Sequence, residues 1–259
     1  MERDEEQRGS SSAEEGRLVA RPRPIAIPGY ACGPLPRAPR AVGKSEPLGL
    51  GAGARDGALF VPSTVTEATP TALVVLLHSA GASAEQILPS VVGVAEREET
   101  LVLAPDSRGP SWDVVTAGFG RDVAFLDGAL QAVFARFVVD PQRIAIAGFS
   151  DGASYALSLG LANGDLFRAV IAFSPGFAAP PVRHGRPRIY VSHGITDRVL
   201  PIARGSRILV PRLRREGYDV VYHELEGGHT LVADDVTRAW CWFLGAASLF
   251  DLERPPVAP

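Results

Sequence analysis

Residues 144–154 read Ile-Ala-Ile-Ala-Gly-Phe-Ser-Asp-Gly-Ala-Ser and form the most informative stretch of the chain. The apolar run from Ile144 to Ala147 predicts a buried strand, and a small-residue pattern typical of a helix follows Gly152. Between them lies G-x-S-x-G, the pattern of a sharp strand-to-helix turn that lifts the Ser150 hydroxyl above a sheet edge. Gly148 and Gly152 suit a turn in which neighbouring backbone leaves no room for a Cβ. Because so short a pattern also occurs by chance, its interpretation depends on the rest of the chain.

Strand-like and helix-like segments alternate on both sides of this turn. Continuous apolar runs predict buried strands, and apolar residues at helical spacing predict helices between them. The expected strands span residues 47–53, 58–61, 71–77, 100–104, 143–149, 169–173, 188–193 and 218–225, and the expected helices span residues 83–98, 122–138, 151–163, 201–216 and 232–244. Ser83 and Gln86 predict a capping box at the start of the first helix. The order predicts a single α/β domain, a doubly wound and mostly parallel sheet with helices on both faces.

Length and composition agree with one domain of this class. The chain has 259 residues, and 46% of them are hydrophobic, which is ordinary for a globular protein. Residues 1–45 are acidic and then rich in proline, which predicts a disordered or peripheral extension. We expect the domain itself at 46–247 and a C-terminal tail at 248–259.

Charge and motif content exclude several classes of function. The net charge of −3 provides no basic surface for nucleic acid, and no apolar run approaches the ~20 residues of a membrane helix. The first 30 residues lack the apolar core of a secretory signal, so we expect a soluble cytoplasmic protein with Cys32 and Cys241 as free thiols. No spacing typical of metal ligands occurs, so we expect no metal. The oligomeric state stays open.

A serine nucleophile needs a base and an orienting acid on loops that follow strands of the same sheet. His229 lies in Glu-Gly-Gly-His-Thr after the last expected strand, which makes it the expected base among five histidines. Asp197 follows the preceding strand and satisfies the chain order Ser, Asp, His, so it is the expected acid. Glu226 is the alternative acid, but its backbone would have to bend sharply to face the imidazole. His78 is expected to brace its own loop.

Attack on a carbonyl also needs N–H groups that face the developing oxyanion. The N–H of Asp151 follows the nucleophile and provides one donor. The loop after the strand at 71–77 provides the second, with Ala80 as the candidate and Ser79 as its alternative.

Four separated motifs resemble the α/β-hydrolase fold esterases. They are Leu77-His78-Ser79-Ala80-Gly81, Gly148-Phe149-Ser150-Asp151-Gly152, His193-Gly194-x-x-Asp197-x-Val199-x-Pro201 and Gly228-His229. Within that fold, the core is similar to the phospholipase/carboxylesterase group and to the polyhydroxybutyrate-depolymerase-like esterases. The resemblance covers residues 47–245, and it is more specific for fold and triad than for substrate.

The resemblance implies a serine hydrolase that works without a cofactor, with Ser150 as nucleophile. These families usually have glycine where this chain has Ser79. If that position requires a positive φ, Ser79 carries a strain of ~1–3 kcal/mol; otherwise its hydroxyl adds to the oxyanion site. The segment after the strand ending at Phe173 is too short for a large lid, so we expect an open, modest pocket edged by Trp112 and Phe177.

The leading functional hypothesis is a carboxylesterase that hydrolyses small or medium acyl or aryl esters. The alternatives within the enzyme class are an intracellular polyester depolymerase, a lysophospholipase-like esterase and a peptidase. The alternative from another class is a binding protein that kept the fold and lost catalysis. Such a protein is expected to lack a member of the triad, and this chain lacks none.

Overall fold

The computed structural model describes residues 12–24, 43–51, 55–116 and 118–245. Its eight strands form one sheet in the order β1-β2-β4-β3-β5-β6-β7-β8. The strands are β1 (Lys44–Pro47), β2 (Gly57–Val61), β3 (Thr71–Leu77), β4 (Thr100–Pro105), β5 (Val139–Phe149), β6 (Ala169–Phe173), β7 (Arg188–Gly194) and β8 (Val220–Leu225). Strand β2 pairs antiparallel with β1 and β4, and the pairs from β4 to β8 are parallel. The predicted mostly parallel α/β sheet is confirmed.

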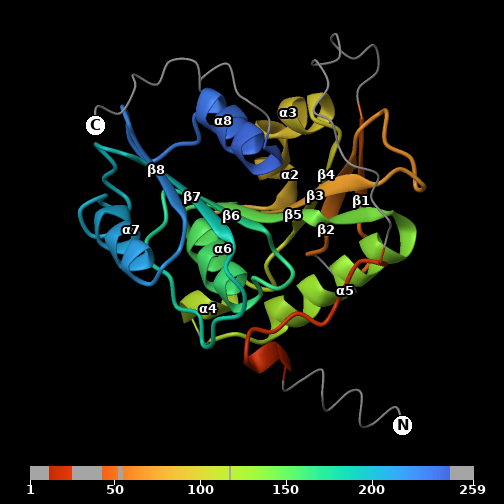
Figure 1. The fold of residues 1–259 in the computed structure, drawn as a ribbon, viewed down its shortest axis with the longest axis horizontal. Coiled ribbons are helices and arrows are strands. Elements are labelled where there is room, and N and C mark those ends of the chain that lie inside the picture. Colours follow the sequence, from red (N-terminus) through yellow and green to blue (C-terminus); the bar gives the residue numbers. More distant parts are fainter. Residues whose placement is uncertain (1–11, 25–42, 52–54, 117, 246–259) are drawn as a thin grey trace.

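Helices cover both faces of this sheet (Figure 1). They are α2 (Ala84–Ile87), α3 (Val92–Arg97), α4 (Asp113–Thr116), α5 (Arg121–Arg136), α6 (Asp151–Ala162), α7 (Ser206–Arg215) and α8 (Ala233–Leu244), with a 3-10 turn η1 (Leu88–Ser90). In the central strand β3, residues 73, 75 and 77 pack with α5, α6 and α7, whereas residues 72, 74 and 76 pack with α2, α3 and α8. This alternation explains why both faces of the strand are apolar.

Several local predictions are wrong. The first strand is Lys44–Pro47 rather than 47–53, because the Asp56 carboxylate accepts hydrogen bonds from the N–H groups of residues 49, 50 and 51 and folds them into a turn. The helix expected at 83–98 is divided into α2, η1 and α3, with Pro89 inside η1. The Ser83 side chain forms no capping bond, and the N–H of Ala84 donates instead to Asp106 at 2.7 Å.

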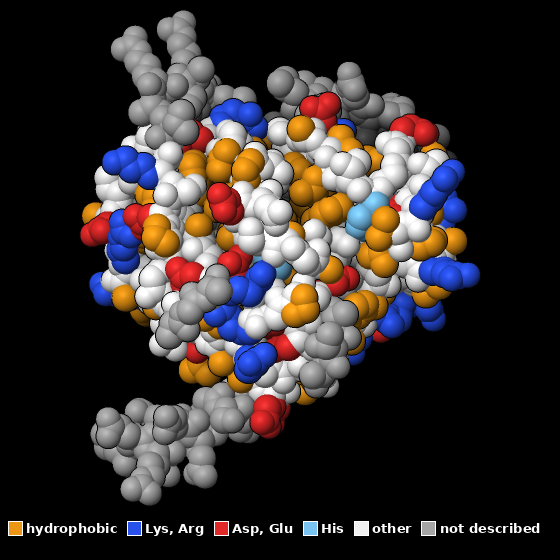
Figure 2. All heavy atoms as spheres, turned by 180° about the vertical axis from the view of Figure 1, so that it is seen from behind, with side chains coloured by type: hydrophobic (Ala, Val, Ile, Leu, Met, Phe, Trp, Pro, Cys, Tyr) orange, Lys and Arg blue, Asp and Glu red, His pale blue; other side chains and the backbone are white. Residues whose placement is uncertain are grey.

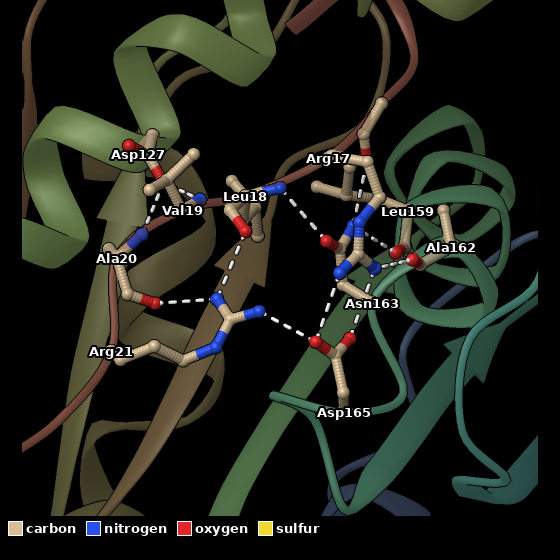
Figure 3. A network of polar contacts seen from close by, with 11 residues as sticks. Arg17, Leu18, Val19, Ala20, Arg21, Asp127, Leu159, Ala162, Asn163 and Asp165 are labelled. Carbon is tan, nitrogen blue, oxygen red and sulfur yellow. Dashed lines mark hydrogen bonds and ion pairs between the residues drawn. The ribbon is translucent and has the colours of Figure 1, made fainter. Parts of the chain in front are cut away.

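Residues 12–24, which we call the N-terminal strap, cross beneath α5 and α6 (Figures 1 and 3). The Arg17 guanidinium donates two hydrogen bonds of 3.0 Å to the Asp165 carboxylate. The Asn163 side chain accepts from the N–H of Leu18 at 2.8 Å and donates to the carbonyl of Gly16 at 2.7 Å. These bonds fix the strap to the C-terminal end of α6, the helix that begins directly after Ser150.

A second anchor of the strap is Asp127 on α5, which accepts from the N–H groups of Val19 and Ala20 at 2.6 and 2.8 Å. Ala13, Leu18 and Ala20 are buried in the core on this face of the sheet. The disordered alternative of the prediction for this extension is therefore wrong for these residues, and the peripheral alternative stays a prediction. The rest of 1–45, apart from 43–45, and the tail at 248–259 lie outside the described residues.

Replacing Leu18 with alanine is expected to lower the free energy of unfolding by about 2–5 kcal/mol, because it removes a buried side chain and leaves a cavity. The neighbouring Val19 is 60% exposed, so Val19→Ala is the matched control and should change stability by less than about 0.5 kcal/mol. Urea unfolding of both variants measures the difference. Equal effects of the two substitutions would contradict the packing of the strap.

Candidate active site

Ser150 lies at the sharp turn between β5 and α6 with φ 60° and ψ −120°. Such a conformation is strained for a residue with a Cβ and is typical of functional turns. A Cβ on Gly148 would lie 2.2 Å from the carbonyl oxygen of Gly152, and one on Gly152 would lie 2.3 Å from the carbonyl oxygen of Leu77. The N–H of Ser150 donates to Phe173 of β6 at 2.9 Å. The glycines therefore allow the close approach, and the neighbouring strand holds the turn.

The structure brings the three predicted catalytic side chains together at the carboxyl ends of β5, β7 and β8. His229 Nε2 lies 2.8 Å from Ser150 Oγ, and His229 Nδ1 lies 2.6 Å from Asp197 Oδ2. An ionised carboxylate can only accept a hydrogen bond, so Nδ1 carries the proton and Nε2 accepts from the serine hydroxyl. This arrangement makes the imidazole a base for Ser150.

The Asp197 side chain is fully buried and accepts hydrogen bonds from His229 and from two backbone N–H groups. The N–H groups of Val199 and Leu200 donate to Oδ1 at 2.9 and 2.8 Å. Burial alone raises the pKa of Asp197, but the hydrogen bonds from His229 and from these N–H groups outweigh it and lower that pKa. Asp197 is therefore ionised at neutral pH and orients His229. Glu226, the alternative acid, is exposed on the same loop as His229.

Glycines and one aromatic ring position His229. A Cβ on Gly194 would lie 2.3 Å from the carbonyl oxygen of Gly228, so the end of β7 packs directly against the histidine loop. Gly227 has a φ of 123°, which side chains rarely adopt. The ring of Phe149 lies 4.8 Å from the His229 ring. The sequence analysis did not single out Phe149, although its place directly before the nucleophile was a usable signal.

His78 braces the loop after β3, as we expected. The side chain is fully buried; its Nδ1 donates to the carbonyl of Ser79 at 2.7 Å, and its Nε2 accepts from the N–H of Ser107 at 3.0 Å. Burial lowers the pKa of His78, which favours this neutral form. None of the bonds that hold this loop uses the N–H of Ser79 or Ala80.

The loop lies against the start of α6, because the Cβ position of Gly152 is within 2.5 Å of the carbonyl oxygen of His78. The turn in this loop is made by Gly81, with a φ of 70°, and its N–H donates to Pro110 at 2.6 Å. Ser79 does not have a positive φ, so the strain considered for it does not arise. The oxyanion roles of Ala80, Asp151 and Ser79 stay predictions.

Trp112 is fully buried and does not edge a substrate pocket, so that prediction is wrong. Its indole N–H donates to the carbonyl of His78 at 2.8 Å, and its ring stacks on Tyr155 at 5.0 Å. Trp112 therefore supports the loop after β3. Phe177 is partly exposed, and the N–H of its neighbour Gly176 donates to Ser154 Oγ at 2.9 Å. The pocket role of Phe177 stays a prediction.

Two carboxylates, Asp122, which is buried, and Asp113, which is half-buried, support the connection between β4 and α5, which contains Trp112. The N–H groups of Arg108 and Asp113 donate to the Asp122 carboxylate at 2.5 and 2.7 Å, and the N–H of Asp122 donates back to Asp113 at 2.9 Å. The pKa of Asp122 is raised to about 6, chiefly by burial. The hydrogen bond from the N–H of Arg108 lowers this pKa, and repulsion from the Asp113 carboxylate raises it. Burial also raises the pKa of Asp113.

The raised pKa of Asp122 predicts a loss of stability as pH rises. Between its usual value of 3.8 and about 6, the folded protein binds more protons at this carboxyl than the unfolded chain. The free energy of unfolding should therefore fall across this window, by about 3 kcal/mol. Urea unfolding of the wild type and of Asp122→Asn at a series of pH values tests this. The difference between the two proteins should change across pH 4–6.5, and parallel curves would contradict the assignment.

Other predicted features concern metals, membranes and thiols. Within the described residues, no cluster of three or more His, Cys, Asp and Glu side chains is arranged to hold a metal ion. In the same part of the chain, no helix has the length and apolarity needed to cross a bilayer. Cys241 is partly exposed on α8, and Cys32 lies outside the described residues.

Comparison with known proteins finds esterases. A family model described as Phospholipase/Carboxylesterase matches residues 115–239. Feruloyl esterase D of Neurospora crassa is 24% identical over 217 residues, which cover 78% of this chain and 73% of that protein. A probable feruloyl esterase C of Aspergillus niger is 28% identical over 60% of this chain and 59% of its own length. The crystal structure of esterase PE8 is 26% identical, with a TM-score of 0.60 over 74% of this chain and 99% of that chain.

Proposed function

Since the chain is a carboxylic ester hydrolase with the α/β-hydrolase fold, we propose that it cleaves small or medium acyl or aryl esters through an acyl-enzyme on Ser150. The observation that carries the proposal is the continuous hydrogen-bonded chain from Ser150 through His229 to Asp197, at 2.8 and 2.6 Å. In these hydrogen bonds the serine hydroxyl donates to His229 and His229 donates to Asp197, which is the arrangement needed for His229 to take the serine proton.

The geometry supports a two-step reaction. In the first step, His229 Nε2 takes the hydroxyl proton while Ser150 Oγ bonds to the ester carbonyl carbon, and the N–H groups of Asp151 and of Ala80 or Ser79 stabilise the oxyanion. His229 then gives the proton to the departing alcohol as the ester C–O bond breaks. In the second step, His229 takes a proton from water while the hydroxide bonds to the acyl carbon. The bond between that carbon and Ser150 Oγ then breaks, His229 returns the proton to Oγ, and the carboxylic acid leaves. Asp197 stabilises the imidazolium in both steps.

Apolar surface near the triad supports an acyl or aryl substrate. Ile195 and Val199, which are 37% and 66% exposed, lie on the loop that carries Asp197. Figure 2 shows hydrophobic side chains gathered around a hollow on one face of the molecule. Residues 174–187, between β6 and β7, contain no helix, which favours an open site. The names of the feruloyl esterase relatives make aromatic acyl groups the first choice for a test.

The test is a panel of p-nitrophenyl esters of increasing acyl length, methyl ferulate and a set of peptides, each with wild type and Ser150→Ala. We expect hydrolysis of the esters and none of the peptides, and no turnover by the variant. Cleavage of peptides in preference to esters would favour the peptidase alternative. Turnover of none of these substrates, together with no labelling by a serine-directed probe, would favour a catalytically silent binding protein.

A further inference from the structure

His193 lies at the end of β7, directly behind the triad, and the reaction described above does not use it. Its ring is buried at 1% exposure. Nε2 lies 2.7 Å from the carbonyl oxygen of Leu200 and 3.2 Å from Asp197 Oδ2, and Nδ1 lies 2.7 Å from Ser206 Oγ. The same oxygen of Asp197 thus has two histidine nitrogens beside it, one from His193 and one from His229.

The contacts determine which ring nitrogen of His193 carries the proton. The carbonyl of Leu200 only accepts, so Nε2 must be the donor. Burial lowers the pKa of His193, which keeps the ring neutral with a single N–H. Nδ1 is therefore an acceptor, and the Ser206 hydroxyl donates to it.

We propose that His193 is a positioning residue, whose Nε2–H holds the Asp197 carboxylate toward His229 while Ser206 fixes the tautomer that can donate. This inference rests on the proposed function of the triad. It adds two buried side chains behind the triad, joined by the hydrogen bond between Ser206 and His193 and by the 3.2 Å contact of His193 Nε2 with Asp197 Oδ2. Ser206 is fully buried at the start of α7, so this helix positions the acid indirectly.

The space around the His193 ring is closely filled by neighbouring residues. A Cβ on Gly205 would lie 3.3 Å from Cε1 of His193 and 2.6 Å from the carbonyl oxygen of Pro175, so no larger residue fits beside it. A neutral ring suits this place, because a charged one would compete with His229 for the negative charge of Asp197.

The charged and titratable groups that act on the His193 ring come from three segments. Asp197 and His229 are on the loops after β7 and β8, and Glu224 pairs with His193 in the register of these strands. Asp197 and Glu224 favour a charged ring, whereas His229 and burial disfavour it, and the net result is a lowered pKa.

The most direct test needs no substitution in the measured protein. Nitrogen-15 spectra of the histidine rings report which nitrogen carries the proton, and His193→Gln identifies the His193 signal by its loss. We expect the neutral Nε2–H form at neutral pH. A ring protonated at Nδ1 alone would have no proton to donate to Asp197 and would overturn the proposal.

A matched pair of variants tests the effect on catalysis. His193→Gln keeps an N–H donor near the Nε2 position, whereas His193→Met has the same length and no donor. We expect His193→Met to lower kcat by about tenfold with little change in KM, because a misplaced acid misaligns the base without altering the substrate surface. His193→Gln should restore most of the lost kcat, and Ser206→Ala should give a smaller loss than His193→Met. His223→Gln, on the neighbouring strand, is the control and should match wild type.

The pH profile distinguishes positioning from simple packing. Without the N–H donor, the negative charge of Asp197 acts more strongly on His229 and favours its protonated form. The acid limb of the pH profile of kcat/KM should therefore move to higher pH in His193→Met and not in His193→Gln. Equal kcat values and unmoved limbs in folded variants would overturn the proposal, and so would equal losses in both variants. Full activity of Ser150→Ala would instead contradict the proposed function of the triad, so the failure of that function can be distinguished from the failure of the role of His193.

Discussion

Ser150→Ala and His229→Ala are each expected to lower kcat for ester hydrolysis by about a millionfold, to the level supplied by binding and the oxyanion site alone. The reason is the geometry of the pair: without the imidazole 2.8 Å away the hydroxyl keeps its proton, and without the hydroxyl no acyl-enzyme forms. The two residues act as one unit, so the double variant should lose no more than either single variant. Steady-state and single-turnover kinetics on a p-nitrophenyl ester measure this.

The matched control for the histidine variant is Thr230→Ala, at the next residue of the same loop, which is exposed. Its kcat should stay within about twofold of wild type. Circular dichroism and urea unfolding of each variant establish that a loss of rate comes from the site and not from unfolding. A folded Ser150→Ala protein that still hydrolysed esters at a substantial rate would contradict the assignment of the nucleophile.

Asp197→Asn is expected to lower kcat by about ten thousandfold. The oxygen Oδ1 accepts from the N–H groups of Val199 and Leu200, and Oδ2 accepts from His229. An asparagine amide must present its NH₂ group to one of these sets of donors. If the NH₂ faces His229, the imidazole is forced into the tautomer that cannot accept the proton of Ser150. If it faces the backbone, two buried N–H groups lose their acceptor.

The control for this variant is Glu226→Gln, which tests the alternative acid directly. Glu226 is exposed on the histidine loop, and its substitution should leave kcat within about twofold of wild type. A large loss in Glu226→Gln together with a small loss in Asp197→Asn would reverse the assignment of the acid.

The central part of this site is predictable from sequence because its chemistry is local or depends on chain order. The turn at Ser150 needs glycines at 148 and 152, which leave a visible pattern. Asp197 and His229 follow successive strands, and parallel strands bring such loops to one edge. Long apolar runs such as β3 and β4 were equally clear, since both of their faces are buried.

The features that sequence reasoning missed depend on contacts between distant residues. Trp112 looks like a pocket residue until its indole is seen bonded to the carbonyl of His78. Leu18 lies in a polar, charged segment, and its burial depends on an N–H bond to Asn163, 145 residues away. Ser83 has the pattern of a helix cap, yet Asp106 takes over that function from another loop. In each case a tertiary contact outweighs the local preference.

The most direct test of the account is covalent labelling of the intact protein with a fluorophosphonate, followed by peptide mass mapping. The account predicts one label per chain, on Ser150, and a loss of ester hydrolysis in proportion to the labelling. The folded Ser150→Ala and His229→Ala proteins should carry no label. Ester hydrolysis that survives complete labelling of Ser150, or a label on another serine that abolishes hydrolysis, would contradict it.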